Sequence, residues 1–321
     1  MLTKSVFVGS FLIVVISSFM AGLLGVCSLT GGCQAQGSGF FSTQADTHPV
    51  ARRSSDQKSI SLITWNLKRL GRDAFRGDLA ARVLAGTSPD IVLAEEVLSG
   101  AKGVRGVMTL AQVLKQVSGG REYCFGISDP SVGQHERKAI FWAKDSLSYV
   151  TTKGTDFTGD CTKPGITLPL MLSRASELDR EPAYAVLRHN TLGKFVVAAV
   201  HLVPTAKKPA REVGPLFDSP RGTPYSKLPT IIAGDFNLAA SHEAFSAART
   251  AGYSPTLPSG IKTSLKMKTR AMSAEYDNIW VKGMSCGKAR VLDTYAALPE
   301  IATKTVYNDV SDHAPVIVQC K

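Results

Sequence analysis

Four short strings in the second half of the chain carry polar side chains suited to acid–base chemistry. They are HLVP (201–204), GDFN (234–237), YDNIW (276–280) and SDHAP (311–315). Each lies next to an apolar, β-branched run that is typical of a buried strand. A buried polar group without a partner costs roughly 1–3 kcal/mol. We therefore expect these side chains to converge on one shared site that satisfies them.

Two of these strings supply histidines, His201 and His313. Histidine titrates near neutral pH, so it can move a proton or donate to a developing negative charge. A lone histidine at a strand end is more often structural. Two such histidines in a chain that also offers carboxylates to orient them favour a catalytic role.

Asp235 and Asn237 follow a buried apolar run through Gly234. A glycine before an acidic turn lets a ligand approach the backbone closely. The alternative is a simple turn at the end of a strand, because aspartate and asparagine are common in turns.

A second group of oxygen-bearing side chains is suited to a divalent cation. Asn66 and Glu96 end consecutive predicted strands and should meet at one edge of a sheet, and Asp312 could add a third ligand. Hard cations prefer carboxylate and carbonyl oxygens. Asn66 could instead cap a turn, and Glu95 is an equal candidate to Glu96 on sequence alone.

The elements that must position these residues alternate between strands and helices from residue 60 onward. We predict helices within 75–84, 108–117 and 241–251, the last capped by Ser241, and a long loop or broken helix over the proline-rich stretch 204–229. This order is typical of a layered α/β domain with mixed sheets. We predict strands at 61–65, 91–94, 139–143, 184–187, 195–200, 230–233, 279–281, 291–293 and 316–318.

The chain has 321 residues, 44% of them hydrophobic, and a net charge of +11. This charge favours acidic partners, although many basic proteins bind nothing acidic. Residues 6–26 are almost wholly apolar, so we assign 1–35 to a signal peptide or membrane anchor and 36–59 to a flexible linker. The remaining 60–321 is one domain. We expect export, to a secreted, periplasmic or outward-facing anchored location, with 6–26 as a candidate membrane tether.

Four cysteines follow the leader. An even number in an oxidising compartment predicts disulfides, and four cysteines allow three connectivities. Proximity in sequence favours Cys124–Cys161 together with Cys286–Cys320, and free buried thiols are the alternative.

Eight motifs in order resemble those of the endonuclease/exonuclease/phosphatase superfamily, in its deoxyribonuclease-I-like branch. Besides the four strings above, they are ITWNL (63–67), PDIVLAEEV (89–97), HERKAIFW (135–142) and REP (180–182). The resemblance spans nearly the whole predicted domain. It implies an α/β fold that is a four-layer α/β/β/α sandwich with two packed mixed β-sheets.

The resemblance also implies roles for individual residues. Asn66, Glu96 and Asp312 would hold Mg²⁺ (or Mn²⁺ or Ca²⁺), with Glu96 favoured over Glu95. His201 would pair with Glu136 and His313 with Asp277. Substrate and water would be handled by Asp235, which positions or deprotonates the attacking water, by Asn237 and Arg180 on phosphate oxygens, and by a hydroxyl contact from Thr263.

The implied activity is that of an exported, divalent-metal-dependent nuclease, most simply an endonuclease, with little sequence preference. DNA is the expected substrate and RNA a second candidate. The alternative is a lipid or inositol-phosphate phosphodiesterase or phosphatase, sphingomyelinase-like, that uses the same site. We expect a monomer with no obligate protein partner. Leu98 and Gln134 stand where deoxyribonuclease I inserts an arginine and a tyrosine into the minor groove, so that contact is not expected here.

Two further sequence features have both a functional and a simpler interpretation. Arg180 could bind a phosphate or merely pair with Asp179 or Glu181. The basic run formed by Lys262, Lys266, Lys268 and Arg270 could follow a polyanion or be an ordinary solvated loop.

Overall fold

The central strands alternate their side chains between two apolar cores, which explains why their sequences are apolar at most positions. The structure, a computed structural model, describes residues 58–131, 135–163, 166–172, 177–220 and 225–321. In β1 (Ile60–Leu70), Leu62 packs between the sheets and Ile63 packs under the helices. In β10 (Thr230–Asp235), Ile231 packs between the sheets and Ile232 packs under the helices of the second sheet. Successive side chains of a strand point to opposite faces, so a strand covered on both sides is expected to be apolar at most positions.

Two mixed sheets form the centre of the molecule. In the first sheet β1 runs parallel to β2 and antiparallel to β14, and in the second β10 runs parallel to β9 and antiparallel to β12. The first sheet has the order β13 (Arg290–Val291), β14 (Val316–Cys320), β1, β2 (Ile91–Leu98), β4 (Glu136–Ala143), β3 (Tyr123–Ile127) and β6 (Leu168–Pro169). The second has the order β11 (Ser254–Pro255), β12 (Asp277–Lys282), β10, β9 (Gly193–His201), β8 (Ala183–His189) and β5 (Leu147–Val150), with β7 (Met171–Leu172) paired to β8.

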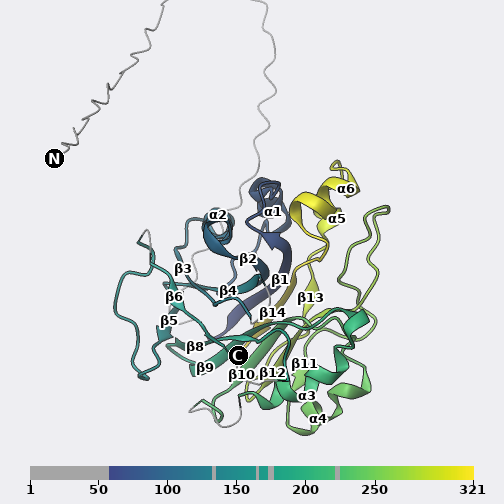
Figure 1. Cartoon of the computed structure of the whole chain (residues 1–321). Coiled ribbons are helices and arrows are strands. Elements are labelled where there is room, and N and C mark those ends of the chain that lie inside the picture. The colour runs from purple at the N-terminus through teal and green to yellow at the C-terminus, as the bar shows by residue number, and fades with distance from the viewer. Residues whose placement is uncertain (1–57, 132–134, 164–165, 173–176, 221–224) are drawn as a thin grey trace, which may run out of the picture. The chain divides into compact units, whose positions relative to one another are not determined.

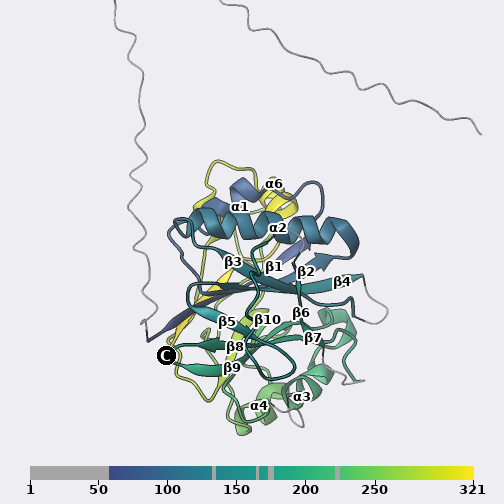
Figure 2. The same cartoon turned by 90° about the vertical axis from the view of Figure 1, so that its left-hand side faces the viewer.

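Helices cover the outer face of each sheet (Figures 1 and 2). The first sheet is covered by α1 (Gly77–Val83), α2 (Gly100–Val117), α5 (Thr294–Ala297), α6 (Thr303–Thr305) and the π-helix η3 (Val306–Val310). The second is covered by α3 (Ala210–Asp218), the 3₁₀ helix η2 (Glu243–Phe245) and α4 (Ser246–Thr250), and a further 3₁₀ turn, η1 (Thr205–Lys207), follows β9. The predicted four-layer α/β/β/α sandwich with two mixed sheets is confirmed.

The helices differ from the sequence-based expectation in their bounds. α2 begins at Gly100 rather than at residue 108, because glycines weaken the helical signal of its first half. Two of these glycines allow close packing: a Cβ on Gly103 would lie 1.7 Å from the carbonyl oxygen of Leu98, and one on Gly106 would lie 2.5 Å from the backbone nitrogen of Gly71. The stretch 204–229 contains a true helix, α3, although Pro215 lies inside it. The segment 241–251 is broken in two, and His242 rather than Ser241 caps its first turn.

Both predicted disulfides are present, Cys124–Cys161 and Cys286–Cys320. The predicted leader (1–35) lies outside the described residues, as does the linker apart from its last two residues. Within the part of the chain that the structure describes, no helix is both long and apolar enough to cross a membrane.

Candidate active site

Strand register gathers the sequence-predicted residues at one end of the two sheets. Asp235 is the last residue of β10, and it lies opposite His201 of β9 on one side and Asp277 of β12 on the other. In the first sheet, Asn66 pairs with Glu95 and Glu136 pairs with Leu98. Because the two sheets pack face to face, the residues at this end of one sheet meet those of the other.

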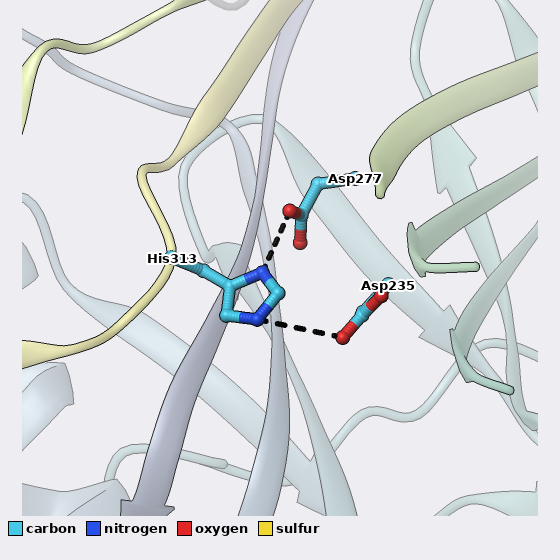
Figure 3. Close-up of side chains that lie close together, drawn as sticks. All are labelled: Asp235, Asp277 and His313. Carbon is cyan, nitrogen blue, oxygen red and sulfur yellow. Dashed lines mark hydrogen bonds and ion pairs between the residues drawn. The ribbon is translucent and has the colours of Figure 1, made fainter. Parts of the chain in front are cut away.

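Asp235 is the centre of the cluster. Its Oδ2 accepts a hydrogen bond from Nδ2 of Asn66 at 3.2 Å and lies 3.5 Å from Nε2 of His201 and 3.6 Å from Nε2 of His313. Its Oδ1 accepts from the backbone N–H of Asn237 at 2.8 Å. Figure 3 shows this carboxylate facing the imidazole of His313. One carboxylate oxygen therefore joins both histidines and the predicted metal side of the site.

His313 and Asp277 form a buried pair. Nδ1 of His313 donates to Oδ2 of Asp277 at 2.7 Å, as Figure 3 shows. Burial opposes a charge on the imidazole, but the carboxylates of Asp277 and Asp235 outweigh it and raise the pKa of His313 well above its usual range. The bond through Nδ1 also orients the ring, which leaves Nε2 toward the centre of the site.

His201 and Glu136 form a second pair of the same kind. Nδ1 of His201 donates to Oε1 of Glu136 at 2.7 Å. Burial disfavours the Glu136 carboxylate, yet the imidazole and the nearby cations lower the pKa of Glu136 to about 2. Burial likewise opposes the imidazolium, and Glu136 outweighs it, so the pKa of His201 is raised.

Arg180 contacts this second pair. Its Nη1 lies 2.5 Å from Nε2 of His201 and 3.6 Å from Oε2 of Glu136. Asp179 pairs instead with Arg211. A guanidinium can only donate, so this contact uses the unprotonated Nε2 of His201. Arg180 and a proton therefore compete for the same ring nitrogen.

A bulge in β2 brings Glu96 to Asn66. Ala94 and Val97 both pack in the core under the helices, so residues 95 and 96 together occupy the place of one. Glu96 takes a positive φ of 57°, which is rare for a residue with a Cβ. Its Oε1 accepts from Nδ2 of Asn66 at 3.2 Å. Strained backbone of this kind is common at functional sites.

Glu95, the alternative candidate, points the other way. It is fully buried between the sheets, where Oε1 accepts from the Thr64 hydroxyl at 3.0 Å and Oε2 has no hydrogen-bond partner. Burial, reinforced by the nearby Asp277 and Asp235 charges, raises the pKa of Glu95 well above its usual range. Because Glu95 points between the sheets, its orientation favours Glu96 as the candidate metal ligand at the exposed edge of the site.

The predicted metal ligands fit a divalent cation by their chemistry. Asp312 has one oxygen, Oδ1, that is buried without a hydrogen-bond partner, and its other oxygen lies 3.8 Å from Lys68 Nζ. Its neighbour Ser311 holds the site together, because its hydroxyl donates to the carbonyl oxygen of Asn66 at 2.5 Å. Two carboxylates and an amide on adjoining segments make up the oxygen-rich set that Mg²⁺, Mn²⁺ or Ca²⁺ accepts.

A second set of donor atoms lies deeper in the site. Asp235, Asp277 and His313 offer ligand atoms that all lie within 4.8 Å of one another. The Nδ1 of His313 is already bonded to Asp277, so only its Nε2 remains for another partner. This arrangement suits an oriented imidazole at least as well as it suits a bound ion.

Thr263 does not occupy the place expected for a substrate contact. It is fully buried, and its hydroxyl accepts from the backbone N–H groups of Tyr276 and Asp277 at 3.2 and 3.0 Å. The hydroxyl therefore positions Asp277 and is not free to reach a phosphate. Asn237, in contrast, lies at the site, where its Nδ2 donates to the Leu202 carbonyl at 3.0 Å.

The predicted basic run lies on one loop and contains an anchoring arginine as well as exposed lysines. Arg270 donates to the carbonyl groups of Tyr295, Leu298, Pro299 and Ile301, so it anchors the loop to α5 and is not free for a polyanion. Lys262, Lys266 and Lys268 are exposed. The loop adjoins the site, since Leu265 N–H donates to the Asp312 carbonyl at 2.6 Å.

Lys138 is a buried cation that the sequence motifs did not single out. It is 1% exposed, and its Nζ lies 3.9 Å from Oε1 of Glu136. Burial lowers the pKa of Lys138, while Glu136 and Glu95 oppose that shift. The sequence does carry a signal for Lys138. It is a lysine at an inward-facing position of a buried strand, and a buried charge needs a partner.

Comparison with known proteins identifies the fold. No family model and no curated protein matches the chain. A conserved protein of unknown function from Enterococcus faecalis V583 superposes with a TM-score of 0.54 at 16% identity, over 82% of this chain and 99% of that one. The structure of D. rerio TDP2 complexed with single-strand DNA product superposes with a TM-score of 0.54 at 15% identity, over 83% of this chain and 100% of that one. An endonuclease/exonuclease/phosphatase family protein from Leptotrichia buccalis C-1013-b superposes with a TM-score of 0.52 at 14% identity, over 82% of this chain and 99% of that one.

Proposed function

Because the chain has the endonuclease/exonuclease/phosphatase fold, we propose that it is a divalent-metal-dependent phosphodiesterase that hydrolyses nucleic acid with little sequence preference. The observation that carries this proposal is the convergence of two histidine–carboxylate pairs on Asp235. Nε2 of His201 and Nε2 of His313 lie 3.5 and 3.6 Å from the same oxygen, and Asn66 donates to it. A fold alone does not define an activity, so the proposal depends on this geometry.

The residues of the site can carry out each part of an in-line hydrolysis. Asp235 orients the attacking water and takes its proton as the water oxygen bonds to phosphorus. The bond between phosphorus and the sugar oxygen breaks, and the proton needed by that oxygen comes from an imidazolium Nε2–H. His313 supplies such a group at neutral pH because its pKa is raised well above the usual range. Asn237 and Arg180 provide N–H donors for the phosphoryl oxygens.

Asn66, Glu96 and Asp312 would hold the divalent cation. When bound, such an ion neutralises charge that develops on the phosphoryl oxygens. The fit is supported by the buried, unpartnered oxygen of Asp312 and by the strained backbone that turns Glu96 toward Asn66. We assign the ion as Mg²⁺, with Mn²⁺ or Ca²⁺ as substitutes.

Nucleic acid is the proposed substrate, and the exported state is the proposed setting. The net charge of +11 and the exposed lysines of the loop that bonds to Asp312 support binding to a polyanion. A TDP2 of similar fold binds a single-strand DNA product. Two disulfides support folding in an oxidising compartment. We propose a monomer that needs no protein partner.

The test is a substrate panel. The purified protein is incubated with plasmid DNA, RNA and sphingomyelin vesicles, with Mg²⁺ and with excess EDTA. We expect cleavage of nucleic acid that EDTA abolishes, and loss of turnover by at least about 100-fold in His201→Ala and His313→Ala. Cleavage of the lipid alone would instead establish the lipid phosphodiesterase, and near-normal turnover in either variant would refute the two-histidine mechanism.

A further inference from the structure

Glu212 is a buried carboxylate outside the catalytic cluster. It lies on α3 on the outer side of the second sheet, and it is 0% exposed. Removing a carboxylate from water is costly unless hydrogen bonds replace the lost hydration. Here each oxygen accepts one backbone N–H: Oε1 from Asp179 at 2.8 Å and Oε2 from Val203 at 2.9 Å. Glu212 therefore ties two separate segments of chain to one helix.

These two segments carry Arg180 and His201. Asp179 directly precedes Arg180. Val203 directly follows Leu202, whose carbonyl faces Nη1 of Arg180 at 3.4 Å. The carboxylate thus holds the backbone on both sides of the contact between Arg180 and His201, which measures 2.5 Å.

The sheet itself does not hold these segments together. The ladder between β8 and β9 ends at the pair Ala183–Ala199. Pro182 comes next and has no N–H to donate, so the ladder cannot continue through it. Continued in the same register, the antiparallel pairing would set Asp179 opposite Val203. The carboxylate of Glu212 bridges the N–H groups of these two residues, where a regular strand pair is missing.

We propose that Glu212 is a positioning residue that acts through Arg180: by bridging the Asp179 and Val203 amides, it sets the guanidinium against His201 and toward the phosphate. This inference rests on the proposed function for its catalytic consequence. The structural part, that Glu212 places Arg180 beside His201, does not depend on which substrate is cleaved.

The chain offers a matched control one residue away. Arg211 also lies on α3 and also contacts Asp179, but through side chains, with Nη2 2.7 Å from Oδ2 in an exposed pair. Exposed pairs of this kind contribute little to stability. Arg211→Met therefore disturbs the same helix and the same partner without touching either amide.

The experiment is a double-mutant cycle of Glu212→Gln with Arg180→Ala. The glutamine keeps the size of the side chain but presents an N–H to one of the two amides. We expect kcat to fall about 10- to 100-fold in Glu212→Gln, because small misplacements of a substrate-orienting group have effects of that size. In the Arg180→Ala background the same change should cost less than about twofold, and Arg211→Met should stay within about twofold of the parent. If the losses in kcat of the two single variants multiply in the double variant, the proposal is overturned.

A second readout does not require activity. The groups that face the His201 ring are Glu136, Asp235 and Arg180. The guanidinium lowers the pKa of His201, so NMR titration should show this pKa rising in Arg180→Ala and rising equally in Glu212→Gln, with no further rise in the double variant. An unchanged His201 pKa in Glu212→Gln would refute the positioning role. If the parent protein cleaved no phosphodiester, the proposed function would fall while this titration still decided the role of Glu212.

Thermal unfolding of each variant shows whether it is folded under assay conditions. If Glu212→Gln is unfolded under assay conditions, Glu212→Asp replaces it in both the kinetic cycle and the NMR titration. The shorter carboxylate keeps the charge but cannot span the two amides, so we expect the same lack of additivity with Arg180→Ala, and multiplied losses would again overturn the proposal.

Discussion

At the scale of single residues, the site depends on carboxylates that fix the orientation and charge of histidines. The Asp277 carboxylate receives the Nδ1–H of His313, and the Thr263 hydroxyl in turn receives the backbone N–H of Asp277. The structure brings the predicted partners Asp277 and His313 into contact, whereas the Thr263 hydroxyl bonds to the backbone of residues 276 and 277. The Thr263 hydroxyl faces the interior, and only the folded chain shows this, because it depends on contacts with the distant residues 276 and 277.

Asp277→Asn should lower kcat by about 10²- to 10⁴-fold with a smaller change in KM. The amide has the shape of the carboxylate, but it no longer stabilises the imidazolium of His313. Steady-state kinetics on a defined oligonucleotide measure the effect. Glu275→Gln, a half-buried acid two residues away, is the control and should keep parental kinetics. Equal losses in both variants would show that the effect is not specific to the pair.

The pair of Glu136 and His201 predicts a particular dependence of stability on pH. The pKa of Glu136 falls from 4.5 to about 2, so its contribution is present above pH 4.5 and is lost as the pH falls through 2. The pKa of His201 is raised, so the same interaction is lost again as the pH rises from 6.5 through the folded-state value.

Glu136→Gln should therefore remove stability in the window between these limits. We expect a loss of roughly 3 kcal/mol at pH 6, because each pKa unit corresponds to about 1.4 kcal/mol, and a much smaller loss near pH 2. Urea unfolding of both proteins across this range measures the difference. A difference that does not change with pH would contradict the assignment.

At the scale of elements, the end of β10 shows how backbone approach sets the site. Gly234 has a φ of 148°, and a Cβ there would lie 1.9 Å from the carbonyl oxygen of Val200 in β9. Only glycine lets β10 approach β9 this closely while Asp235 comes opposite His201. The apolar run before it predicted the strand, but not this close contact.

Gly234→Ala should destabilise the fold by about 3 kcal/mol or more, since both the clash and the backbone conformation oppose a side chain. Gly193→Ala is the control: this glycine also has a positive φ, of 72°, but open space surrounds it. We expect it to cost about 1–2 kcal/mol. Chemical denaturation compares the two, and a smaller cost at Gly234 than at Gly193 would contradict the argument.

The loop that carries Lys266 and Lys268 is the element expected to meet the substrate. The loop is fixed at its base by Arg270, its lysines are exposed, and Leu265, which directly precedes Lys266, donates its backbone N–H to the Asp312 carbonyl. Replacing both lysines by alanine should weaken DNA binding and reduce the slope of log K against log salt by about 1.4–1.8, since each phosphate contact contributes about 0.7–0.9.

Lys288 and Lys321 provide the comparison for this loop. They lie at the other end of the first sheet, where Gly287 N–H donates to the Gln319 carbonyl and Lys321 N–H to the Ser285 carbonyl. Replacing both should leave the salt slope unchanged in fluorescence-anisotropy titrations. Equal reductions in the two double variants would show that the basic surface acts only through net charge.

At the scale of the whole molecule, two disulfides close loops within the domain. Their sequence separations are 37 and 34 residues. Loops of this size are stabilised by roughly 3–4 kcal/mol each through the entropy of the unfolded chain. With Cys27 and Cys33 replaced by serine, the denatured, unreduced protein should show no free thiol, and reduction should lower Tm. Four free thiols would rule out both bridges.

The sequence by itself determined the class of the fold and supplied the residues of the proposed site. Strand-end motifs such as GDFN and SDHAP are short and local, and burial of apolar strands on both faces follows from composition alone. The tertiary structure decided what depends on register and packing. It turned Glu96 outward and Glu95 inward, buried the Thr263 hydroxyl, and placed Glu212 between two segments that no ladder joins. Those outcomes arise from contacts between residues far apart in sequence, and local propensity carries no information about such contacts.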